Sequence, residues 1–441
     1  MSFHSSHTPE DRATPPCPHF GPCGGCQLQH LTYPAQLELK AAHLRALFAT
    51  TGLTIPELQL HASPPFAYRN RIRLSLAQVD DRLRAGYIRN PNGGHNFNGG
   101  RESGWPILSA PFAERVGYRT LSAAERVDRL PPSSAANPTL SFLPIAQCPI
   151  AAPILWRATE AFLTLANEGP VAWLSAADQL ELFTAGDESR LQLTLYLRAN
   201  PKSIPANLAA AFSAFCEQLR SHIPELTGAA IALLPAASTQ RSRRTEATRP
   251  GPAWGAAGLN YRVSEIDYWV PRSAFFQTNR FLLPELLSVV TADRTGAFAW
   301  DLYAGVGLFS RALALAFTQV VAVEIAEPAA SALAAGSKTT KLPNLRAVKA
   351  TTLDFLRAAA VQRDRPSLIV LDPPRTGAGP EVCALLARIA AATVVYVSCS
   401  PETLPRDLAT LTASGYTVTQ LRLLDLFPQT THIETVAVLT R

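Results

Sequence analysis

The chain has 441 residues, enough for two or three domains, and 47% hydrophobic residues, enough to fill well-formed cores. Only 17% of the residues are charged, so the composition excludes an intrinsically disordered protein. The net charge of +6 fits a polyanionic partner such as nucleic acid, but it is too modest to identify one. No apolar run is long enough to span a bilayer, and Met1 to Pro16 lack the apolar core of a signal peptide. We therefore expect a cytoplasmic protein with no membrane partner.

Four of the seven cysteines have the pattern of a metal site. A polar tail, predicted to be disordered over residues 1–16, is followed by a C-x5-C-x2-C cluster, and one further cysteine lies far downstream. The four are Cys17, Cys23, Cys26 and Cys148. Four thiolates can hold tetrahedral zinc or an iron–sulfur cluster, and spacing alone does not decide between them. A paired-knuckle zinc site has two C-x2-C units and this chain has one, which favours [4Fe–4S] with zinc as the alternative. We expect His19 beside the site or at the surface, and Cys216 and Cys383 in helix cores.

The N-terminal and central parts are predicted to form a cluster segment and an α+β domain. Apolar residues at helical spacing predict a helix from Gln36 to Phe48, within a cluster segment over residues 17–60. Residues 61–265 mix short alternating strands with helices, and we interpret this part as RNA-binding. Loops are predicted at 90–104 and 238–255, where glycine, asparagine, serine and proline are frequent.

One strand of the central domain combines a basic and an apolar face. The stretch 71–76 alternates arginine or serine with isoleucine or leucine, which predicts a half-buried strand. Its basic face makes Arg69, Arg71 and Arg73 candidates to hold RNA phosphates.

From residue 266 to 441 strands and helices alternate, which predicts a doubly wound α/β sheet. Helices are expected between the strands, for example at 310–316 and 380–391. The last two strands have no helix between them, so we expect an antiparallel hairpin at the sheet edge. The predicted strands are 297–303, 319–324, 345–350, 367–372, 393–398, 416–424 and 433–439.

An acid and a thiol end two of these strands. Asp372 follows the apolar run 368–371, and Cys399 follows the run 393–397. Both runs lack polar alternation, as expected of parallel strands covered on both faces. Chemistry in open α/β sheets gathers at the carboxyl ends of strands, so the two side chains are predicted to share one crevice. The alternative for Cys399 is a buried structural cysteine, which its place beside serine and proline disfavours.

A nucleotide pocket is predicted at the end of the first strand of this sheet. Tyr303, Gly305 and Gly307 form a turn there, and Glu324 ends the next strand, in the arrangement that binds ribose in nucleotide folds. The third glycine of dinucleotide sites is replaced by Ser310. This disfavours a pyrophosphate cofactor and favours S-adenosylmethionine, which has no phosphates.

Together these motifs resemble the RNA (uracil-5-)-methyltransferase family, specifically its iron–sulfur branch that acts on large-subunit rRNA. The resemblance runs from Cys17 to Arg441 and has no match over residues 90–140. It rests on motifs that occur in the family's order, none of them highly specific alone. They are the cysteine loop at 17–30, Tyr-Arg-Asn-Arg at 68–71, Phe-Phe-Gln-Thr-Asn at 275–279, Leu-Asp-Pro-Pro-Arg at 371–375, Ser-Cys-Ser-Pro at 398–401, and Phe-Pro at 427–428 with His-Ile-Glu at 432–434.

The resemblance implies a class I S-adenosylmethionine methyltransferase domain and a role for each matching residue. Cys399 is then the nucleophile and Glu434 the general base, and the four cysteines hold the cluster. The pocket for S-adenosylmethionine and uracil is then lined by Gln277, Tyr303, Gly305, Glu324, Thr351 and Asp372. The chain departs from the family at Leu308, where some members have asparagine, and at Thr351, where an acid often contacts adenine. The N-terminal RNA-binding barrel of several members is not seen before Cys17.

The implied reaction is methylation of uridine at C5. A thiolate adds to C6, C5 then attacks the methyl sulfonium, and a base removes the C5 proton so that the thiolate leaves. We expect a polar or electropositive site in which the thiolate is accessible near neutral pH. The target base has to leave its stack to reach the pocket.

The preferred substrate is 23S rRNA, and the protein is expected to act as a monomer. The alternatives are a tRNA uridine methyltransferase and a non-catalytic, metal-containing RNA-binding assembly factor. A radical enzyme fits neither the cysteine spacing nor the fold. Cytosine-5 enzymes have a second cysteine near Asp-Pro-Pro, which is absent from 371–379, and amino-group methyltransferases need no thiol.

Overall fold

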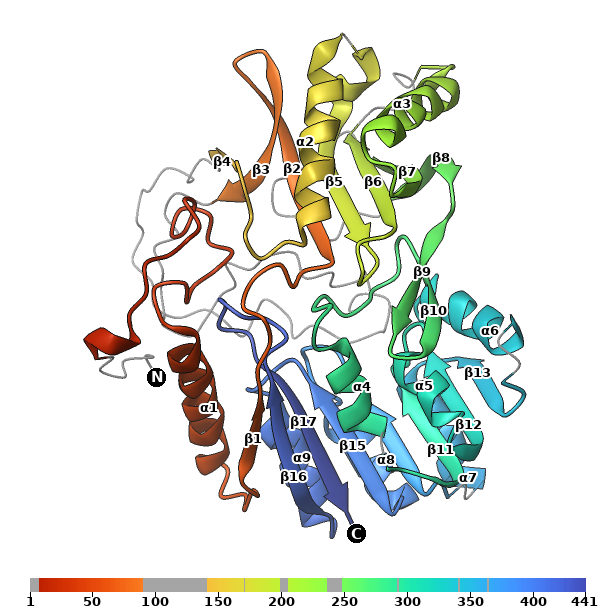
Figure 1. Ribbon diagram of the computed structural model, residues 1–441. Helices are drawn as coiled ribbons and strands as arrows, with labels where there is room; N and C mark the ends of the chain where they lie inside the picture. Colours follow the sequence, from red (N-terminus) through yellow and green to blue (C-terminus); the bar gives the residue numbers. More distant parts are fainter. Residues whose placement is uncertain are drawn as a thin grey trace, which may run out of the picture.

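The computed structural model describes residues 8–89, 141–169, 171–198, 205–235, 248–291, 293–339, 342–362 and 365–441. Two lobes are each built on a large β-sheet, and the N-terminal segment lies along their side (Figure 1). The predicted loop at 90–104, the unmatched residues up to 140, and Arg241, Arg243 and Arg244 of the second predicted loop lie outside the described residues. Across the described ranges, no helix combines the length and apolarity needed to cross a membrane.

The larger sheet has the predicted doubly wound form. Its eight strands follow the order β1-β16-β17-β15-β14-β11-β12-β13. The strands from β15 to β13 run parallel, and β17 is antiparallel to both of its neighbours. The antiparallel last strand is thereby confirmed. The bounds are β1 (Leu58–His61), β11 (Gly296–Leu302), β12 (Phe317–Glu324), β13 (Leu345–Lys349), β14 (Leu368–Leu371), β15 (Thr393–Ser398), β16 (Thr417–Leu424) and β17 (Glu434–Thr440).

The predicted position of the last two strands at the sheet edge is wrong. β16 and β17 are antiparallel partners, but β17 lies between β15 and β16. The edge is formed by β1, which pairs in parallel with β16 so that Leu58 lies opposite Leu421. The N-terminal segment is therefore built into the larger sheet.

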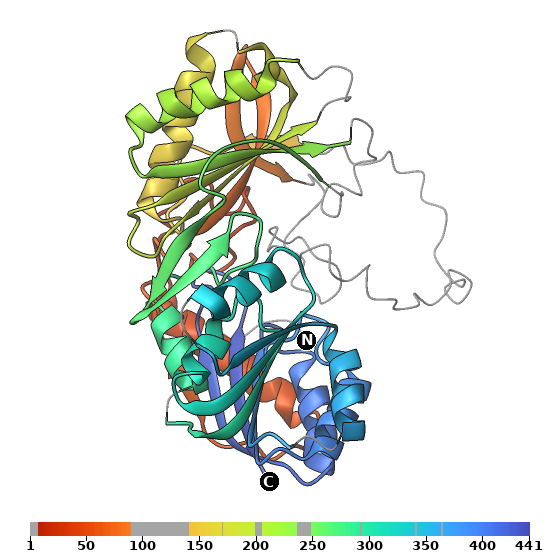
Figure 2. The same ribbon diagram turned by 90° about the vertical axis from the view of Figure 1, so that its right-hand side faces the viewer.

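Helices cover both faces of this sheet (Figure 2). One face packs against α4 (Leu283–Thr291), α5 (Leu308–Leu313) and α6 (Ala329–Thr339). The other face packs against α1 (Tyr33–Ala49), α7 (Thr352–Gln362), α8 (Pro380–Ile389) and α9 (Leu404–Ala413). From α1, Leu44 and Phe48 are at most 1% exposed in the second core, and each such burial contributes about 1.5–3 kcal/mol. Cys383 lies in this core, as predicted.

The smaller sheet follows the order β4-β3-β2-β5-β6-β7-β8 and is antiparallel except between β6 and β7. Helices α2 (Pro153–Glu168) and α3 (Leu208–His222) pack on it and enclose Cys216, as predicted. Short 3-10 turns lie at Pro9–Asp11 and Ala172–Ala176. The strand bounds are β2 (Arg71–Val79), β3 (Arg82–Arg89), β4 (Ser141–Pro144), β5 (Ala177–Thr184), β6 (Leu191–Arg198), β7 (Leu226–Leu234) and β8 (Arg249–Gly255).

Two sequence expectations need correction at the junction of the lobes. Residues 249–255, expected to be loop, form the edge strand β8, where Pro250 and Pro252 are tolerated because an edge strand does not need every N–H. The hairpin of β9 (Gly258–Val263) and β10 (Ile266–Pro271) packs in the core of the larger sheet. The expected domain boundary at residue 265 falls within this hairpin, so we draw the boundary before β9.

Candidate active site

The glycine turn after β11 opens a space at the carboxyl end of the sheet. Tyr303, Gly305 and Gly307 all have a positive φ, of 61°, 57° and 92°. A Cβ added to Gly305 would meet no atom within 4 Å, whereas one added to Gly307 would lie 2.7 Å from Leu333 Cδ1. Gly307 thus allows the helix that follows to pack closely, and Gly305 leaves its side of the turn free for a ligand.

Glu324 closes this turn from the next strand. Its buried carboxylate accepts N–H donors from Gly305 at 2.8 Å, Ile325 at 2.7 Å and Ala326 at 2.6 Å. The acid expected to bind ribose therefore lies directly against the glycine turn. The residues present fit an adenosyl ligand: an open glycine turn stands beside a fixed carboxylate.

Thr351 lies one strand further along the sheet, before α7. Its hydroxyl donates to Asp354 Oδ2 at 2.6 Å and accepts from Asp354 N–H at 3.0 Å. This is the hydrogen bonding of a helix N-cap. A contact from Thr351 to a cofactor stays a prediction.

Asp372 and Gln277 meet beside the turn. Gln277 Nε2 donates to Asp372 Oδ2 at 3.4 Å. Burial, and secondarily the charge of Asp301, raise the pKa of Asp372 to about 7. Asp301 itself is fully buried, bonded to Ser310 Oγ, and burial raises its pKa to about 7 as well. Asp301 was not singled out from the sequence, although it stands two residues before Tyr303.

Gln277 is fixed from both lobes. Asn70 Nδ2 donates to the Gln277 carbonyl at 2.9 Å, and Asn70 N–H donates to Thr278 O at 3.0 Å. Asn279 Nδ2 donates to Leu426 O at 3.2 Å. The stretches 68–71 and 275–279, which resemble two family motifs, therefore pack against each other at the edge of the site.

Cys399 and Glu434 occupy the ends of adjacent strands, and their roles as thiol and base stay a prediction. Cys399 follows β15, Glu434 begins β17, and these strands pair with Ser398 opposite Thr435. Burial, then the charges of Glu434 and Asp372, raise the pKa of Cys399 to about 12. Burial, then Asp372, also raise the pKa of Glu434 well above its ordinary value. The expected site was polar or electropositive; in the free protein the thiol has the carboxyl groups of Glu434 and Asp372 beside it as well as Arg375, so the site is polar.

Arg375 and His432 complete this site, and the sequence did not assign them a role. Arg375 Nη2 lies 3.3 Å from His432 Nδ1. The guanidinium lowers the pKa of both Cys399 and Glu434, against the larger effect of burial. Burial, then Arg375, hold the pKa of His432 at about 3, so its imidazole is neutral. They could have been found from the sequence, because Arg375 and His432 lie in the two family-like motifs that also contain Asp372 and Glu434.

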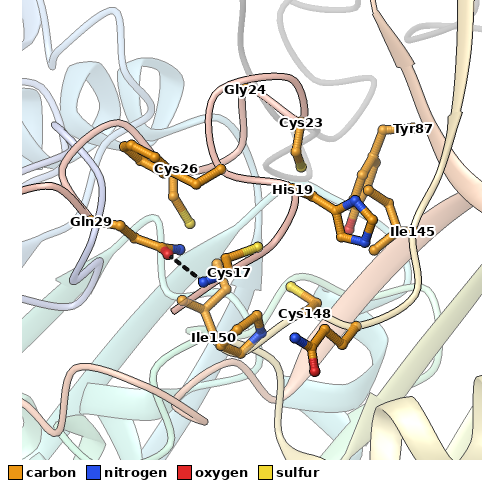
Figure 3. Close-up of a pocket in the computed structure, with 13 residues that line it drawn as sticks. Cys17, His19, Cys23, Gly24, Cys26, Gln29, Tyr87, Ile145, Cys148 and Ile150 are labelled. Atoms are coloured by element: carbon orange, nitrogen blue, oxygen red, sulfur yellow. Dashed lines mark hydrogen bonds between the residues drawn. The ribbon is translucent and has the colours of Figure 1, made fainter. Parts of the chain in front are cut away.

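The four predicted cluster cysteines line a single pocket between the N-terminal loop and the β4–α2 connection (Figure 3). Burial raises the pKa of Cys23 and Cys26 to about 12 and that of Cys148 to about 11. His19 Nε2 accepts the N–H of Ala146 at 2.9 Å and so ties the two loops together. Within the described residues, no group of three His, Cys, Asp or Glu side chains is arranged to hold a metal ion.

The surroundings of this pocket suit bound thiolates. Arg69 is 4% exposed, and its charge lowers the pKa of Cys26 and Cys148 against the effect of burial. Gln29 Oε1 accepts the N–H of Cys17 at 3.2 Å, and hydrogen bonding by the same side chain lowers the pKa of Cys26 against the effect of burial. A cation and a donor thus stand beside the sulfur atoms. The four cysteines are the donor types of a group that binds four thiolates, although among the described residues no three of them are arranged to hold a metal ion.

The expected phosphate contacts of the arginines are wrong for two of them. Arg69 is buried beside the cysteines, and Arg71 is buried with Glu181 at 3.4 Å and stacked on Phe183. Arg73 is partly exposed and stacks on Tyr196. Of the three, only Arg73 is not fully buried, so a phosphate contact stays a prediction for Arg73 alone.

Comparison with known proteins agrees with this geometry. Residues 257–441 match the model of the tRNA (Uracil-5-)-methyltransferase family. An uncharacterized RNA methyltransferase of Thermotoga maritima is 27% identical over 98% of this chain and 86% of its own length. A 23S rRNA (uracil(1939)-C(5))-methyltransferase of Pseudomonas putida is 27% identical over 97% of this chain and 80% of its own.

A solved structure extends the similarity to the whole fold. The Pyrococcus abyssi tRNA (uracil-54, C5)-methyltransferase in complex with S-adenosyl-L-homocysteine has a TM-score of 0.63 at 22% identity, over 94% of this chain and 86% of that one. The solved structure supports the fold, and the family model over residues 257–441 together with the full-length relatives supports an RNA (uracil-5-)-methyltransferase.

Proposed function

We propose that this enzyme methylates C5 of a uridine in 23S rRNA through a covalent bond to Cys399, with Glu434 as the base. The observation that carries the proposal is the placement of Cys399 and Glu434 on adjacent strand ends, at the sheet edge that also carries Asp372 after β14 and the glycine turn after β11. The choice of rRNA is supported by the 23S rRNA enzymes that align with nearly the whole chain, and by the cysteine pocket.

The roles of the protein side chains follow from the chemistry of uracil, whose C5 is a poor nucleophile. S-adenosylmethionine supplies the methyl group as a sulfonium. The Cys399 thiolate adds to C6, and the electrons of the C5–C6 double bond move toward O4, which makes C5 nucleophilic. After C5 has gained the methyl group, Glu434 removes the C5 proton. The C5–C6 double bond forms again as Cys399 leaves as a thiolate.

The acidic surroundings of Cys399 fit a cationic methyl donor. In the free protein burial, then Glu434 and Asp372, raise the pKa of the thiol, so it stays protonated. A sulfonium placed among these carboxyl groups would favour the thiolate, because an opposite charge nearby stabilises the charged form of an acid. The pocket for this donor would be lined by Gln277, Tyr303, Gly305, Glu324, Thr351 and Asp372.

We propose further that Cys17, Cys23, Cys26 and Cys148 hold a [4Fe–4S] cluster. Binding needs all four sulfur atoms as thiolates, and Arg69 supplies a buried positive charge beside them. The cluster would then link the N-terminal loop, through Cys17, Cys23 and Cys26, to Cys148 of the central lobe. We propose that this lobe binds RNA.

Replacing Cys23 with serine is expected to remove this group. Protein purified without oxygen should contain about four iron atoms and four acid-labile sulfides per chain, with absorption near 400 nm. Cys23→Ser should lose most of both, whereas Cys216→Ser, at a buried cysteine outside the pocket, should keep them. Zinc without sulfide in the wild type would contradict the cluster.

Methylation of rRNA is tested by mass mapping of uridines in a deletion strain. We expect loss of 5-methyluridine at one 23S rRNA position, restored by the wild-type gene and not by Cys399→Ala. Loss in tRNA instead would assign the enzyme to the alternative substrate. If every methyluridine persists in a strain without redundant enzymes, the proposal fails.

A further inference from the structure

The loop that leads to Glu434 contains one strained residue. Gln429 lies in the connection 425–433 between β16 and β17, is 3% exposed and has a φ of 69°. A residue other than glycine in the left-handed region is unfavourable and persists only where its surroundings fix it. The contacts of Gln429 therefore show what holds this loop in place.

Those contacts come from the N-terminal segment. The N–H groups of Gln27 and Leu28 both donate to the Gln429 carbonyl, at 2.9 and 3.0 Å. Gln36 forms a reciprocal pair with the same residue. Its Nε2 donates to Gln429 Oε1 at 3.0 Å, and its Oε1 accepts the Gln429 N–H at 3.0 Å. The backbone N–H, the backbone carbonyl and the side chain of Gln429 all form hydrogen bonds with residues in the segment 27–36.

A second connection runs from the cysteine loop to the same place. Gln27 directly follows Cys26, and its Nε2 donates to Gly24 O at 2.7 Å. Its Oε1 accepts the N–H of Thr431 at 3.4 Å, further along the loop toward Glu434. The side chain of Gln27 thus bridges the cysteine loop and the loop that ends at Glu434.

We infer that Gln27 and Gln36 are positioning residues for the base, through which the cysteine loop sets the place of Glu434. The inference rests on the proposed role of Glu434. Cys399 is held differently, since it follows β15 and is not part of the 425–433 loop. Loss of these contacts should therefore slow removal of the C5 proton more than addition of the thiolate. A displacement of about 1 Å can slow such a step up to about 100-fold.

The test compares how much enzyme is joined to RNA containing uridine and to RNA containing 5-fluorouridine. Fluorine at C5 cannot leave as a cation, so the adduct with 5-fluorouridine persists and counts every chain able to add the thiolate. With uridine, adduct accumulates only when proton removal is slow. In Gln36→Leu and Gln27→Ala we expect a higher ratio of uridine adduct to 5-fluorouridine adduct, with turnover per competent chain reduced about 10- to 100-fold.

Gln192→Leu is the matched control. Gln192 is equally buried on β6 of the central lobe. It bonds Thr227 of the same lobe and Gly258 and Arg272 at the ends of the β9–β10 hairpin, none of which is a candidate site residue. Its ratio should equal that of the wild type even if the variant is less stable. If Gln36→Leu forms no 5-fluorouridine adduct because it misfolds, Gln27→Ala, at a half-buried position, decides the question.

Two outcomes would overturn different claims. An unchanged ratio and unchanged turnover per competent chain in the glutamine variants would refute their positioning role. Absence of any 5-fluorouridine adduct with the wild type would instead refute the proposed covalent function.

Discussion

Glu434→Gln is expected to lower turnover by about 10²- to 10⁴-fold while leaving the enzyme covalently bound to uridine RNA. Glutamine keeps the size of the side chain but cannot accept the C5 proton. Addition of Cys399 and methyl transfer precede that step, so the methylated adduct should accumulate. Denaturing gels of protein mixed with labelled RNA measure the covalent adduct. Incorporation of labelled methyl groups into RNA measures turnover.

The same variant should alter the pH dependence of the reaction. Burial and Asp372 raise the pKa of Glu434, so the base carries its proton at pH values where an ordinary glutamate has lost it. Turnover should fall as the pH is lowered, starting above the ordinary range of glutamate. In Glu434→Gln the part of this fall that is due to Glu434 should vanish, and the part that is due to the Cys399 thiol should remain. Glu381→Gln, at an exposed carboxylate of α8, should behave as wild type. A variant that loses adduct and turnover together would show that Glu434 acts before the elimination step.

The larger sheet was predictable because its signals are local. Each parallel strand is an apolar run followed by a turn, and the buried runs 368–371 and 393–398 carry Asp372 and Cys399 at their ends. The strand–helix alternation makes the strands parallel, so the carboxyl ends that carry these two side chains lie at the same edge of the sheet. The sequence therefore predicted that these two side chains would share one crevice.

The features that the sequence did not predict depend on contacts between residues that are far apart in the chain. β1 has four residues, and its partner strand β16 lies more than 300 residues later, so nothing local marks it as the sheet edge. The alternation at 71–76 marks two faces but not which one is covered. Arg71 is buried because Glu181 and Phe183 arrive on β5. For Cys399, the sequence places acids nearby but does not give their number or burial, which decide the pKa.

Lys40→Met is expected to lower the free energy of unfolding by about 3–5 kcal/mol. Lys40 is 1% exposed on α1, and its Nζ donates to Asp425 Oδ1 at 2.6 Å and to Phe427 O at 3.0 Å. Methionine fills the space but leaves the carboxylate of Asp425 buried without its cation. Urea unfolding followed by circular dichroism measures the loss.

Two variants separate this ion pair from other effects. Lys40→Met combined with Asp425→Leu should recover most of the stability, because an apolar pair often replaces a buried ion pair at little cost. Arg45→Met removes an exposed ion pair with Glu38 on the same helix and should cost no more than about 1 kcal/mol. Equal losses in Lys40→Met and Arg45→Met would mean that the buried pair does not hold α1 to the loop before Glu434. A large loss restored by the double variant would show that the cost of Lys40→Met comes from the buried carboxylate of Asp425, which Lys40 of α1 pairs with in the loop before Glu434.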